Sequence, residues 1–367
     1  MTHNSLSGVS VIICCYNSSA RLSKTLEYIS QQEVPGYIPW EVIIVDNNST
    51  DNTASVARKI WNALNCTVPF KVIQESTPGL TYARKKGIAE ASYDLLVFCD
   101  DDNWLERNYI QTAYGIMNEH ENIGVLGAKS TGFYETEKPT WFDRFGQAYA
   151  IGKPARQSGI INARTFVAGA GMILKKSTLQ LLEMFSFKQL LSDRKGNQLS
   201  SGGDAELCLV LLFLGFDLYY DERLQFVHFM PANRLSWEYC VSMISKGHAI
   251  PQVHLQFYNY CHKKAFQNEK TDFRDAYAAI RQKLLRELLR TIVHMKPFWY
   301  SLRLLAKSLP GSRNEIALKA NLNKLKYLLT HKKDLRQDYN TIYALIQNIH
   351  QYKSASVKQL APLDKIS

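Results

Sequence analysis

The chain has 367 residues, 46% of them hydrophobic, and a formal net charge of +11. This length and apolar content allow one large domain or two, and they exclude a disordered tail or a small disulfide-stapled module. The seven cysteines are odd in number and irregularly spaced, without a CxxC pair that would indicate zinc, which is typical of reduced cysteines in a cytoplasmic protein.

Four short runs rich in β-branched residues predict buried strands in the first hundred residues. They cover residues 9–15, 41–46, 71–74 and 94–99. Helices are predicted between them, over residues 21–31, 52–64 and 80–91. Repeated strand-helix units imply an α/β fold with a parallel, doubly wound sheet, whose ligand-binding loops lie at the carboxyl ends of the strands.

The loops after the first two strands differ from those of common nucleotide-binding proteins. Residues 15–19 contain no glycine, which weakens a dehydrogenase or P-loop interpretation. The second strand ends at Asp46, and small polar residues follow as far as Asp51. An Asp at a strand end can accept hydrogen bonds from a ribose hydroxyl or a base imide, and small polar residues cap helices. A ligand-binding role and a simple helix cap both fit this segment.

Three consecutive carboxylates, Asp100, Asp101 and Asp102, follow the apolar run at residues 95–99. Like charges this close repel one another unless a cation lies among them. Mg²⁺ and Mn²⁺ prefer carboxylate oxygens and commonly bridge to substrate phosphates. The triplet therefore predicts a divalent-cation site at a ligand-binding edge of the sheet, with a solvated acidic turn as the alternative.

The middle of the chain breaks the strand-helix alternation. Residues 129–165 are rich in aromatic side chains without a clear period, which predicts a long functional loop. Trp141 there, and Trp237 further on, suit either stacking on a ligand or packing in a core. Further strands are predicted over residues 165–174, near 218–220 and over 225–229, and a buried helix over 205–214.

The C-terminal third is predicted to be helical and is strongly basic. Residues 1–240 carry 22 Lys and Arg against 25 Asp and Glu, whereas residues 241–367 carry 22 against 8. Leucines paired at helical spacing with Arg and Lys between them, as over residues 281–290, predict amphipathic helices that either pack against other helices or rest on an anionic membrane surface. No apolar run reaches the ~20 residues that a bilayer span requires, so a soluble or peripheral protein is expected.

In their order along the chain, these motifs resemble the family 2 glycosyltransferases of GT-A fold. The segments that carry the resemblance are residues 16–17, 45–51, 78–84, 98–102 and 202–207. It implies a catalytic domain over residues 1–234 with a Rossmann-like, mostly parallel sheet, followed by a helical, basic region over 235–367. The implied reaction is metal-dependent, inverting transfer of one sugar from a nucleotide-diphospho-sugar, with a UDP-sugar favoured.

The resemblance also implies the setting and the roles of individual residues. The acceptor would be a glycan or lipid-linked hydroxyl in bacterial cell-surface polysaccharide assembly, at the inner face of the cytoplasmic membrane. Mn²⁺ or Mg²⁺ would bind Asp102, with His228 as a further ligand that some relatives have. The donor nucleotide and sugar would contact the remaining residues, namely Tyr16, Asn17, Asp46, Asn48, Arg84, Asp100 and Asp101.

Asp204 is the candidate catalytic base. An inverting transfer needs a carboxylate that removes the proton of the acceptor hydroxyl. The family has an acidic pair at the start of this helix, and here Gly203 stands at the first position while Asp204 is retained. The alternative for Asp204 is a helix N-terminal charge favoured by the macrodipole. His228, alone on an apolar strand, is alternatively a buried core residue.

Two other functions remain open. A nucleotidyltransferase shares the nucleotide-binding sheet and the metal carboxylates, but it usually has a Gly-rich basic loop after the first strand, which residues 15–19 lack. A glycan- or nucleic-acid-binding protein on a decayed transferase scaffold is suggested by Gly203 and the basic C-terminal third. No nucleic-acid-binding motif accompanies that charge, so no nucleic-acid partner is expected.

Overall fold

The computed structural model describes residues 7–194, 199–295 and 309–360, with side chains as far as residue 355. The chain divides into two compact units. Unit 1 comprises residues 1–180, 192–199 and 203–240, and unit 2 comprises residues 181–191, 200–202 and 241–367. The functional division that the resemblance implies, residues 1–234 and 235–367, remains a prediction.

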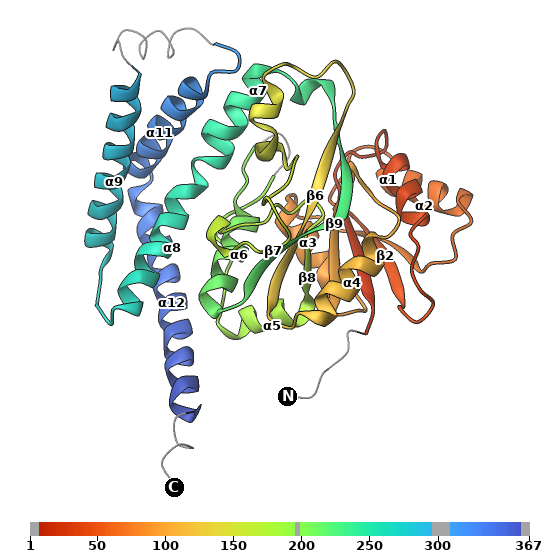
Figure 1. Ribbon diagram of the computed structural model, residues 1–367, viewed down its shortest axis with the longest axis horizontal. Coiled ribbons are helices and arrows are strands. Elements are labelled where there is room, and N and C mark those ends of the chain that lie inside the picture. Colours follow the sequence, from red (N-terminus) through yellow and green to blue (C-terminus); the bar gives the residue numbers. More distant parts are fainter. Residues whose placement is uncertain (1–6, 195–198, 296–308, 361–367) are drawn as a thin grey trace. The chain divides into compact units, whose positions relative to one another are not determined.

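Unit 1 is built around a nine-stranded sheet with the strand order β3-β2-β1-β4-β8-β6-β9-β5, and β7 pairs with β9 (Figure 1). The strands are β1 (Val9–Cys15), β2 (Trp40–Asp46), β3 (Phe70–Gln74), β4 (Leu95–Asp100), β5 (Asn103–Leu105), β6 (Ile123–Tyr134), β7 (Gly159–Ile160), β8 (Ile173–Lys175) and β9 (Asp217–Met230). The helices up to residue 242 are α1 (Leu22–Ser30), α2 (Thr53–Ala63), α3 (Leu80–Glu90), α4 (Tyr109–Glu119), α5 (Lys176–Met184), α6 (Gly203–Leu214) and α7 (Trp237–Ser242).

The sheet has a parallel side and a mixed side. β1 pairs in parallel with β2 and β4, and β2 with β3, which makes β3-β2-β1-β4 the parallel side. On the mixed side, β8 is antiparallel to β4 and β6, and β9 is parallel to β6 but antiparallel to β5 and β7. The α/β prediction is confirmed, with parallel pairing dominant only on the first side.

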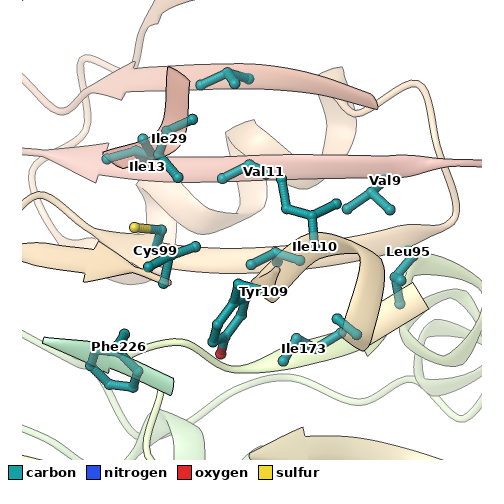
Figure 2. Packing of buried hydrophobic residues seen from close by; sticks show 14 of the residues in the cluster. Val9, Val11, Ile13, Ile29, Leu95, Cys99, Tyr109, Ile110, Ile173 and Phe226 are labelled. Atoms are coloured by element: carbon teal, nitrogen blue, oxygen red, sulfur yellow. The ribbon is translucent and has the colours of Figure 1, made fainter. Parts of the chain in front are cut away.

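Helices cover both faces of the parallel side. Val9, Val11 and Ile13 point from β1 into one core together with side chains of α1, α2 and α4 (Figure 2). On the opposite face, α3 lies so close to β1 that a Cβ at Gly87 would be 2.5 Å from Ile12 Cγ2. Only glycine permits this approach. Alternating residues of each buried strand thus pack on different helices, as expected for a doubly wound sheet.

The first four strands and three helices agree with the predictions, while three later predictions are wrong. Residues 165–174 are not one strand, since β8 begins only at Ile173 and Gly171 has a φ of +69°. The two short strands predicted after residue 217 are one long strand, β9. Residues 129–134 are not loop but continue β6, because β9 gives β6 a parallel neighbour along its length.

The aromatic residues that were expected either to stack on a ligand or to pack in a core mostly pack on one another. The Trp141 and Trp237 rings meet edge to face with centroids 5.1 Å apart, and Phe142 beside Trp141 is fully buried. Edge-to-face packing of this kind stabilises a core. Of the two predicted roles, packing in a core is therefore the correct one for Trp237, which is 4% exposed.

Unit 2 is helical in its described part. After a π-helical turn at Met243–His248 come α8 (Pro251–Phe266), α9 (Phe273–His294), α11 (Arg313–Thr330) and α12 (Lys332–Leu360). Asp272 and Ser312 cap α9 and α11 by accepting hydrogen bonds from Asp275 N and Glu315 N. Within the described residues, every helix falls short of the combination of length and apolarity that crossing a membrane requires.

Candidate functional site

The loops that follow β1 and β2 are joined by hydrogen bonds. Asn17, in a left-handed conformation with a φ of 50°, accepts a hydrogen bond from Thr50 N through Oδ1 at 2.8 Å. Asn17 N donates to Ser49 Oγ at 3.0 Å. Tyr16 next to it is 42% exposed. The loop is therefore fixed by its backbone and by Asn17, which leaves the Tyr16 ring free to contact a ligand.

Asp46 and its neighbours shape the end of β2. Asp46 is buried and accepts a hydrogen bond from Ser49 N at 3.2 Å, whereas Asn48 is exposed with a φ of 57°. Asn47, which the sequence analysis did not single out, accepts from Gly79 N at 2.7 Å and donates to Thr77 O at 2.7 Å. Asn47 thus ties the start of α3 to this loop.

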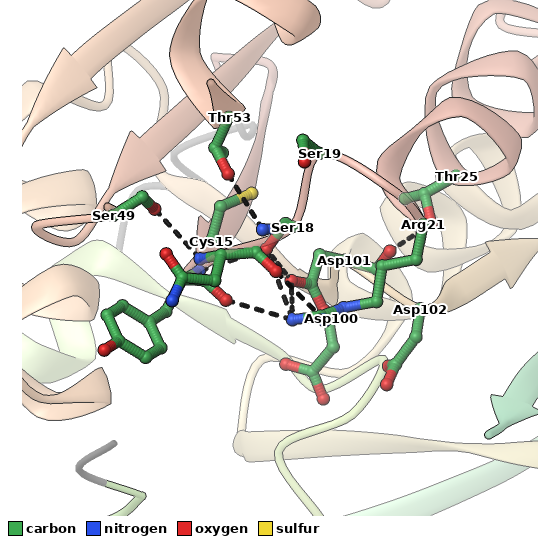
Figure 3. A network of polar contacts seen from close by, with 12 residues as sticks. Cys15, Ser18, Ser19, Arg21, Thr25, Ser49, Thr53, Asp100, Asp101 and Asp102 are labelled. Atoms are coloured by element: carbon green, nitrogen blue, oxygen red, sulfur yellow. Dashed lines mark hydrogen bonds and ion pairs between the residues drawn. The ribbon is translucent and has the colours of Figure 1, made fainter. Parts of the chain in front are cut away.

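Asp101 is turned toward the parallel side of the sheet. Its carboxylate accepts hydrogen bonds from Ser18 Oγ and from Arg21 Nη2, the latter at 2.7 Å, and its carbonyl accepts one from Thr25 Oγ1 at 2.9 Å. Figure 3 shows the Asp101 side chain pointing at Ser18 and Arg21, while the carboxylates of Asp100 and Asp102 point away from them. No pattern in the sequence distinguished Asp101 from its neighbours.

Asp102 meets two basic side chains from the mixed side of the sheet. His228 Nε2 lies 3.4 Å from Asp102 Oδ1, and Arg234 Nη1 lies 3.1 Å from Asp102 Oδ2. Burial opposes ionisation of this carboxyl, but His228 and Arg234 outweigh it and hold the Asp102 pKa well below its usual range. Arg234 was not predicted, because a lone arginine after a strand has no recognisable pattern.

Asp100 is the member of the triplet that resists ionisation. Burial and the neighbouring charge of Asp102 raise the Asp100 pKa to about 6, although Arg84 acts in the opposite direction. Burial and Asp102 also raise the Asp101 pKa, which Arg21 opposes. Asp100 at the end of β4 and the two residues after it, Asp101 and Asp102, thus have three different environments.

Asp102 and His228 have suitable donor atoms for a divalent metal ion. Both side chains are at least nine-tenths buried, and their facing atoms are a carboxylate oxygen and an imidazole nitrogen. Nδ1 of His228 is buried without a hydrogen-bond partner among the described residues. Within the described ranges, no three His, Cys, Asp or Glu side chains converge on one point, so an ion here would need further oxygens from a ligand.

Arg84 and Asp204 form an ion pair instead of lying apart in separate subsites. Arg84 Nη1 contacts Asp204 Oδ1 and also lies 3.2 Å from Asp193 Oδ2, and its guanidinium lies 5.4 Å from the Phe98 ring centroid. Burial lowers the Arg84 pKa, but the two carboxylates outweigh it and raise the pKa above its usual range. Gly169 N donates to Asp204 Oδ2 at 2.7 Å.

Asp204 remains accessible, with 24% of its side chain exposed at the first turn of α6. Asp193 and Gly169 are not predicted from the sequence as site residues, although Gly169 lies in the recognisable run of small residues Ala168-Gly169-Ala170-Gly171. A Cβ at Gly169 would lie 2.5 Å from Asp204 Oδ2. A larger residue at this position would therefore push the Asp204 carboxylate out of its present place.

A protein-family comparison identifies part of this chain. Residues 10–182 match the model described as glycosyl transferase family 2. A segment of just under half the chain is thus similar to a family 2 glycosyl transferase domain. The match includes Asp46, Arg84 and the acidic triplet, and it ends before Asp204 and His228.

Curated relatives align with this chain over short segments. Glycosyltransferase GlyA of Streptococcus pneumoniae is 27% identical over 141 residues, which are 38% of this chain and 19% of GlyA. Poly(ribitol-phosphate) beta-N-acetylglucosaminyltransferase TarS of Staphylococcus aureus is 28% identical over 117 residues, 32% of this chain and 20% of TarS. Glycosyltransferase AglE of Haloferax volcanii is 36% identical over 105 residues, 27% of this chain and 33% of AglE. The chain thus spans a third or less of these relatives.

A solved structure similar to this chain is that of S. aureus TarS 1–349 in complex with UDP-GlcNAc. It has a TM-score of 0.48 and 16% sequence identity, and the match covers 96% of this chain and 92% of that one.

Proposed function

We propose that this protein is a metal-dependent, inverting glycosyltransferase. It would move one sugar from a nucleotide-diphospho-sugar, with a UDP-sugar favoured, to a glycan or lipid-linked hydroxyl in cell-surface polysaccharide assembly. The observation that carries the proposal is the buried Asp102, which faces His228 at 3.4 Å directly after a strand of the segment similar to a family 2 domain. TarS, whose name gives β-N-acetylglucosaminyl transfer to poly(ribitol-phosphate), supports a sugar-containing donor and a polymer acceptor.

The parallel side of the sheet would bind the nucleoside. The exposed Tyr16 ring would stack on the base, and Asp46 would accept hydrogen bonds from the base imide or the ribose. Asn17 and Asn48 lie in the two loops beside them, and Asn17 fixes the loop conformation through Thr50. Asp100, whose raised pKa allows it to carry a proton near pH 6, would contact the ribose or the donor sugar.

Asp102 and His228 would hold Mn²⁺ or Mg²⁺ together with oxygens of the diphosphate. Such an ion would neutralise the charge on the leaving nucleoside diphosphate. Arg234, bonded to Asp102 at 3.1 Å, places a fixed positive charge at the same point. Asp101 would stay on Arg21 and Ser18 and hold the loop, so we assign it a structural role instead of the donor contact first expected.

Asp204 would be the catalytic base. The acceptor oxygen forms a bond to the anomeric carbon while the bond from that carbon to the diphosphate oxygen breaks, and the hydroxyl proton passes to Asp204. The 24% exposure of the Asp204 side chain allows an acceptor hydroxyl to approach it. Arg84, on the other side, orients the carboxylate.

The proposal is tested by nucleoside diphosphate release from a panel of UDP-, GDP- and dTDP-sugars with Mn²⁺, with and without glycan acceptors. We expect release from one nucleotide class by the wild type. For substitutions of Asp102, Asp221→Asn is the matched control. Like Asp102, Asp221 is buried and paired with an arginine, but it lies seven positions before His228 on β9. Pyrophosphate release from a nucleoside triphosphate and a sugar phosphate would support a nucleotidyltransferase instead. No turnover with any donor would contradict both the glycosyltransferase and the nucleotidyltransferase as functions of this protein.

We further propose that helix α9 rests on an anionic phospholipid surface. Leu285, Leu289 and Val293 follow one another every four residues and are 40%, 59% and 58% exposed. Exposed basic residues flank this stripe on the helix, namely Arg281, Lys283, Arg286 and Arg290, and within the described residues none of them forms an ion pair. An apolar stripe between cations is typical of helices that lie in a membrane interface.

The charges also favour lipid over a second copy of the chain. Glu287, the one acidic residue between Ala276 and His294, is turned to Lys324 of α11 at 3.0 Å. From Ala276 to His294, the exposed charged residues of α9 are therefore all basic, and two such faces would repel each other. Each cation near an anionic leaflet adds about 1 kcal/mol of attraction.

Flotation with vesicles of phosphatidylglycerol and phosphatidylcholine, or of phosphatidylcholine alone, tests this surface. We expect binding to the anionic vesicles only, and its loss when Leu285, Leu289 and Val293 are all changed to Gln. Leu329→Gln is the control, because Leu329 is an equally exposed apolar residue on α11. Equal binding by the wild type and the triple variant, no binding by the wild type, or a change in oligomeric state alone would refute the proposal.

A further inference from the structure

Asp193 is a buried carboxylate with a separate partner for each oxygen. Its Oδ2 lies 3.2 Å from Arg84 Nη1, and its Oδ1 accepts a hydrogen bond from Gly203 N at 3.0 Å. The residue is 5% exposed. The backbone carbonyl of its neighbour Arg194 accepts a hydrogen bond from Leu80 N at 3.0 Å, which anchors the segment to the start of α3. Asp193 thus links α3, which carries Arg84, to the first residue of α6.

We propose that Asp193 is the second carboxylate of the candidate catalytic site, a positioning residue that shares Arg84 with Asp204. The inference rests on the proposed function, because it assigns Asp193 a role in the proton transfer to Asp204. Gly203 stands where the resembled family has an acidic residue beside the base. In this chain a carboxylate reaches the same point from another segment, since Asp193 bonds to the backbone of Gly203.

Asp204 is held on both oxygens. Arg84 contacts Oδ1, and Gly169 N donates to Oδ2 at 2.7 Å. A Cβ at position 169 would press on the Arg84 guanidinium and the Asp204 carboxylate, so a larger residue there would displace these two side chains. To accept a proton, the Asp204 carboxylate has to give up part of its bonding to Arg84.

Asp193 removes the main cost of that step. Arg84 is enclosed, with 12% of its side chain exposed, and a buried charge without a partner is strongly unfavourable. When Asp204 takes the acceptor proton and becomes neutral, Arg84 still has the Asp193 carboxylate as its counter-charge. Without Asp193, protonation of Asp204 would leave the guanidinium unpaired, so the proton transfer would become harder.

The test compares Asp193→Asn with the wild type in turnover, pH-rate profile, nucleotide binding and melting temperature. Asn retains an oxygen for Gly203 N but loses the charge. We expect kcat to fall about 10- to 100-fold, part of the usual contribution of a general base, with nucleotide affinity unchanged. The acid limb of the profile should move to lower pH, because Arg84 alone then keeps Asp204 ionised.

Two further variants keep the test decisive if Asp193→Asn folds poorly. Asp193→Glu retains the charge and should keep the wild-type pH profile with a smaller loss of kcat. Asp193→Asn combined with Arg84→Gln removes both the carboxylate and the unpaired guanidinium, and should return the acid limb toward higher pH. Asp221→Asn is again the control for loss of a buried, arginine-bound carboxylate.

The outcomes separate this inference from the proposed function. An active wild type with an Asp193→Asn variant of equal kcat and equal profile would refute the role of Asp193 alone. A fall in kcat that follows the melting temperature, with the profile unmoved in all variants, would show a purely structural residue and refute it too. A wild type without turnover on any donor would refute both.

Discussion

The two sides of the sheet in unit 1 use polar side chains in different ways. On the parallel side, the loops after β1, β2 and β4 bond mainly to one another, as in the contacts of Asn17 with Thr50 and of Arg21 with Asp101. The mixed side and the helix between its strands supply His228, Arg234 and Asp204, and these bond to residues of the parallel side.

The polar contacts of the parallel side thus determine the shape of the loops, whereas the contacts between the two sides position charges. Hydrogen bonds within the parallel side fix the loops and should mainly contribute to stability. Ion pairs between the two sides place charges where a diphosphate and an acceptor would meet, so they should mainly affect function. Substitutions at the two kinds of contact test this difference between stability and function.

The largest effect is expected from Asp204→Asn, at an ion pair between the two sides. Losing a general base costs about 10²- to 10⁴-fold in rate. We therefore expect a fall of that size in kcat for sugar transfer, measured at saturating donor and acceptor. Nucleotide affinity, measured by calorimetry, should remain at the wild-type value. A variant that keeps turnover but loses nucleotide affinity would move Asp204 from the base to the donor site.

Asp101→Asn should affect stability more than function. It removes the buried charge that accepts hydrogen bonds from Arg21 and Ser18, which we expect to lower the free energy of unfolding by about 1–3 kcal/mol. Urea denaturation measures this. Glu33→Gln, which removes an exposed ion pair with Arg107, should change it by less than about 0.5 kcal/mol. Loss of metal-dependent nucleotide binding by folded Asp101→Asn would reverse the assigned roles.

Glu41 on β2 provides a pH-dependent test of the parallel side. Burial opposes its ionisation, but hydrogen bonds from Ser92 N at 2.6 Å, Lys71 Nζ and Ser10 Oγ lower the Glu41 pKa below its usual value. A lowered pKa in the folded state stabilises the fold above the pKa of the unfolded chain and loses that contribution as the pH falls through the folded value.

We accordingly expect Glu41→Gln to lower the unfolding free energy by about 1–2 kcal/mol at pH 7 and by progressively less as the pH falls below the ordinary range of a glutamate. Denaturation curves between pH 3 and pH 7 show this directly. A difference between wild type and variant that grows toward low pH would have the wrong sign. Turnover at pH 7 should be unaffected.

A smaller effect is expected from Arg234→Gln. Arg234 shares Asp102 with any cation bound there, so its removal takes away a repelling charge. We expect the affinity for Mn²⁺ alone to rise about 3- to 10-fold, measured by electron paramagnetic resonance of free Mn²⁺. Arg223→Gln, at the Asp221 pair on the same strand, should leave it unchanged. Weaker Mn²⁺ binding in Arg234→Gln would indicate that Arg234 orders Asp102 instead of competing for it.

The sequence predicted the parallel side well, because its signals are local. Apolar runs such as Val9–Cys15 end at polar residues, and an Asp at the end of β2 or β4 has to lie at the edge of the sheet. The same signal predicts a cation site at the acidic triplet. It does not divide the three carboxylates, since only the fold shows that Arg21 binds the middle one.

The mixed side was harder because its contacts join segments far apart in the chain. Asp193 and Arg84 are 109 residues apart, and Asp102 and Arg234 are 132 apart. Single charged residues in loops leave no periodic pattern, so nothing identified them as partners. The sequence predicts two strands in place of β9 because Asp221, Glu222 and Arg223 interrupt its apolar residues. In the structure, its pairing with β6 continues on both sides of these three residues.

The proposed donor site is tested most directly by isothermal titration of UDP, with and without Mn²⁺, into the wild type, Asp102→Asn and Asp101→Asn. We expect Mn²⁺-dependent binding by the wild type, its loss in Asp102→Asn, and its retention in Asp101→Asn, because Asp102 faces His228 whereas Asp101 faces Arg21. Retention in Asp102→Asn together with loss in Asp101→Asn would contradict the assignment. No binding by the wild type, with UDP or with GDP and dTDP in its place, would contradict the donor site itself.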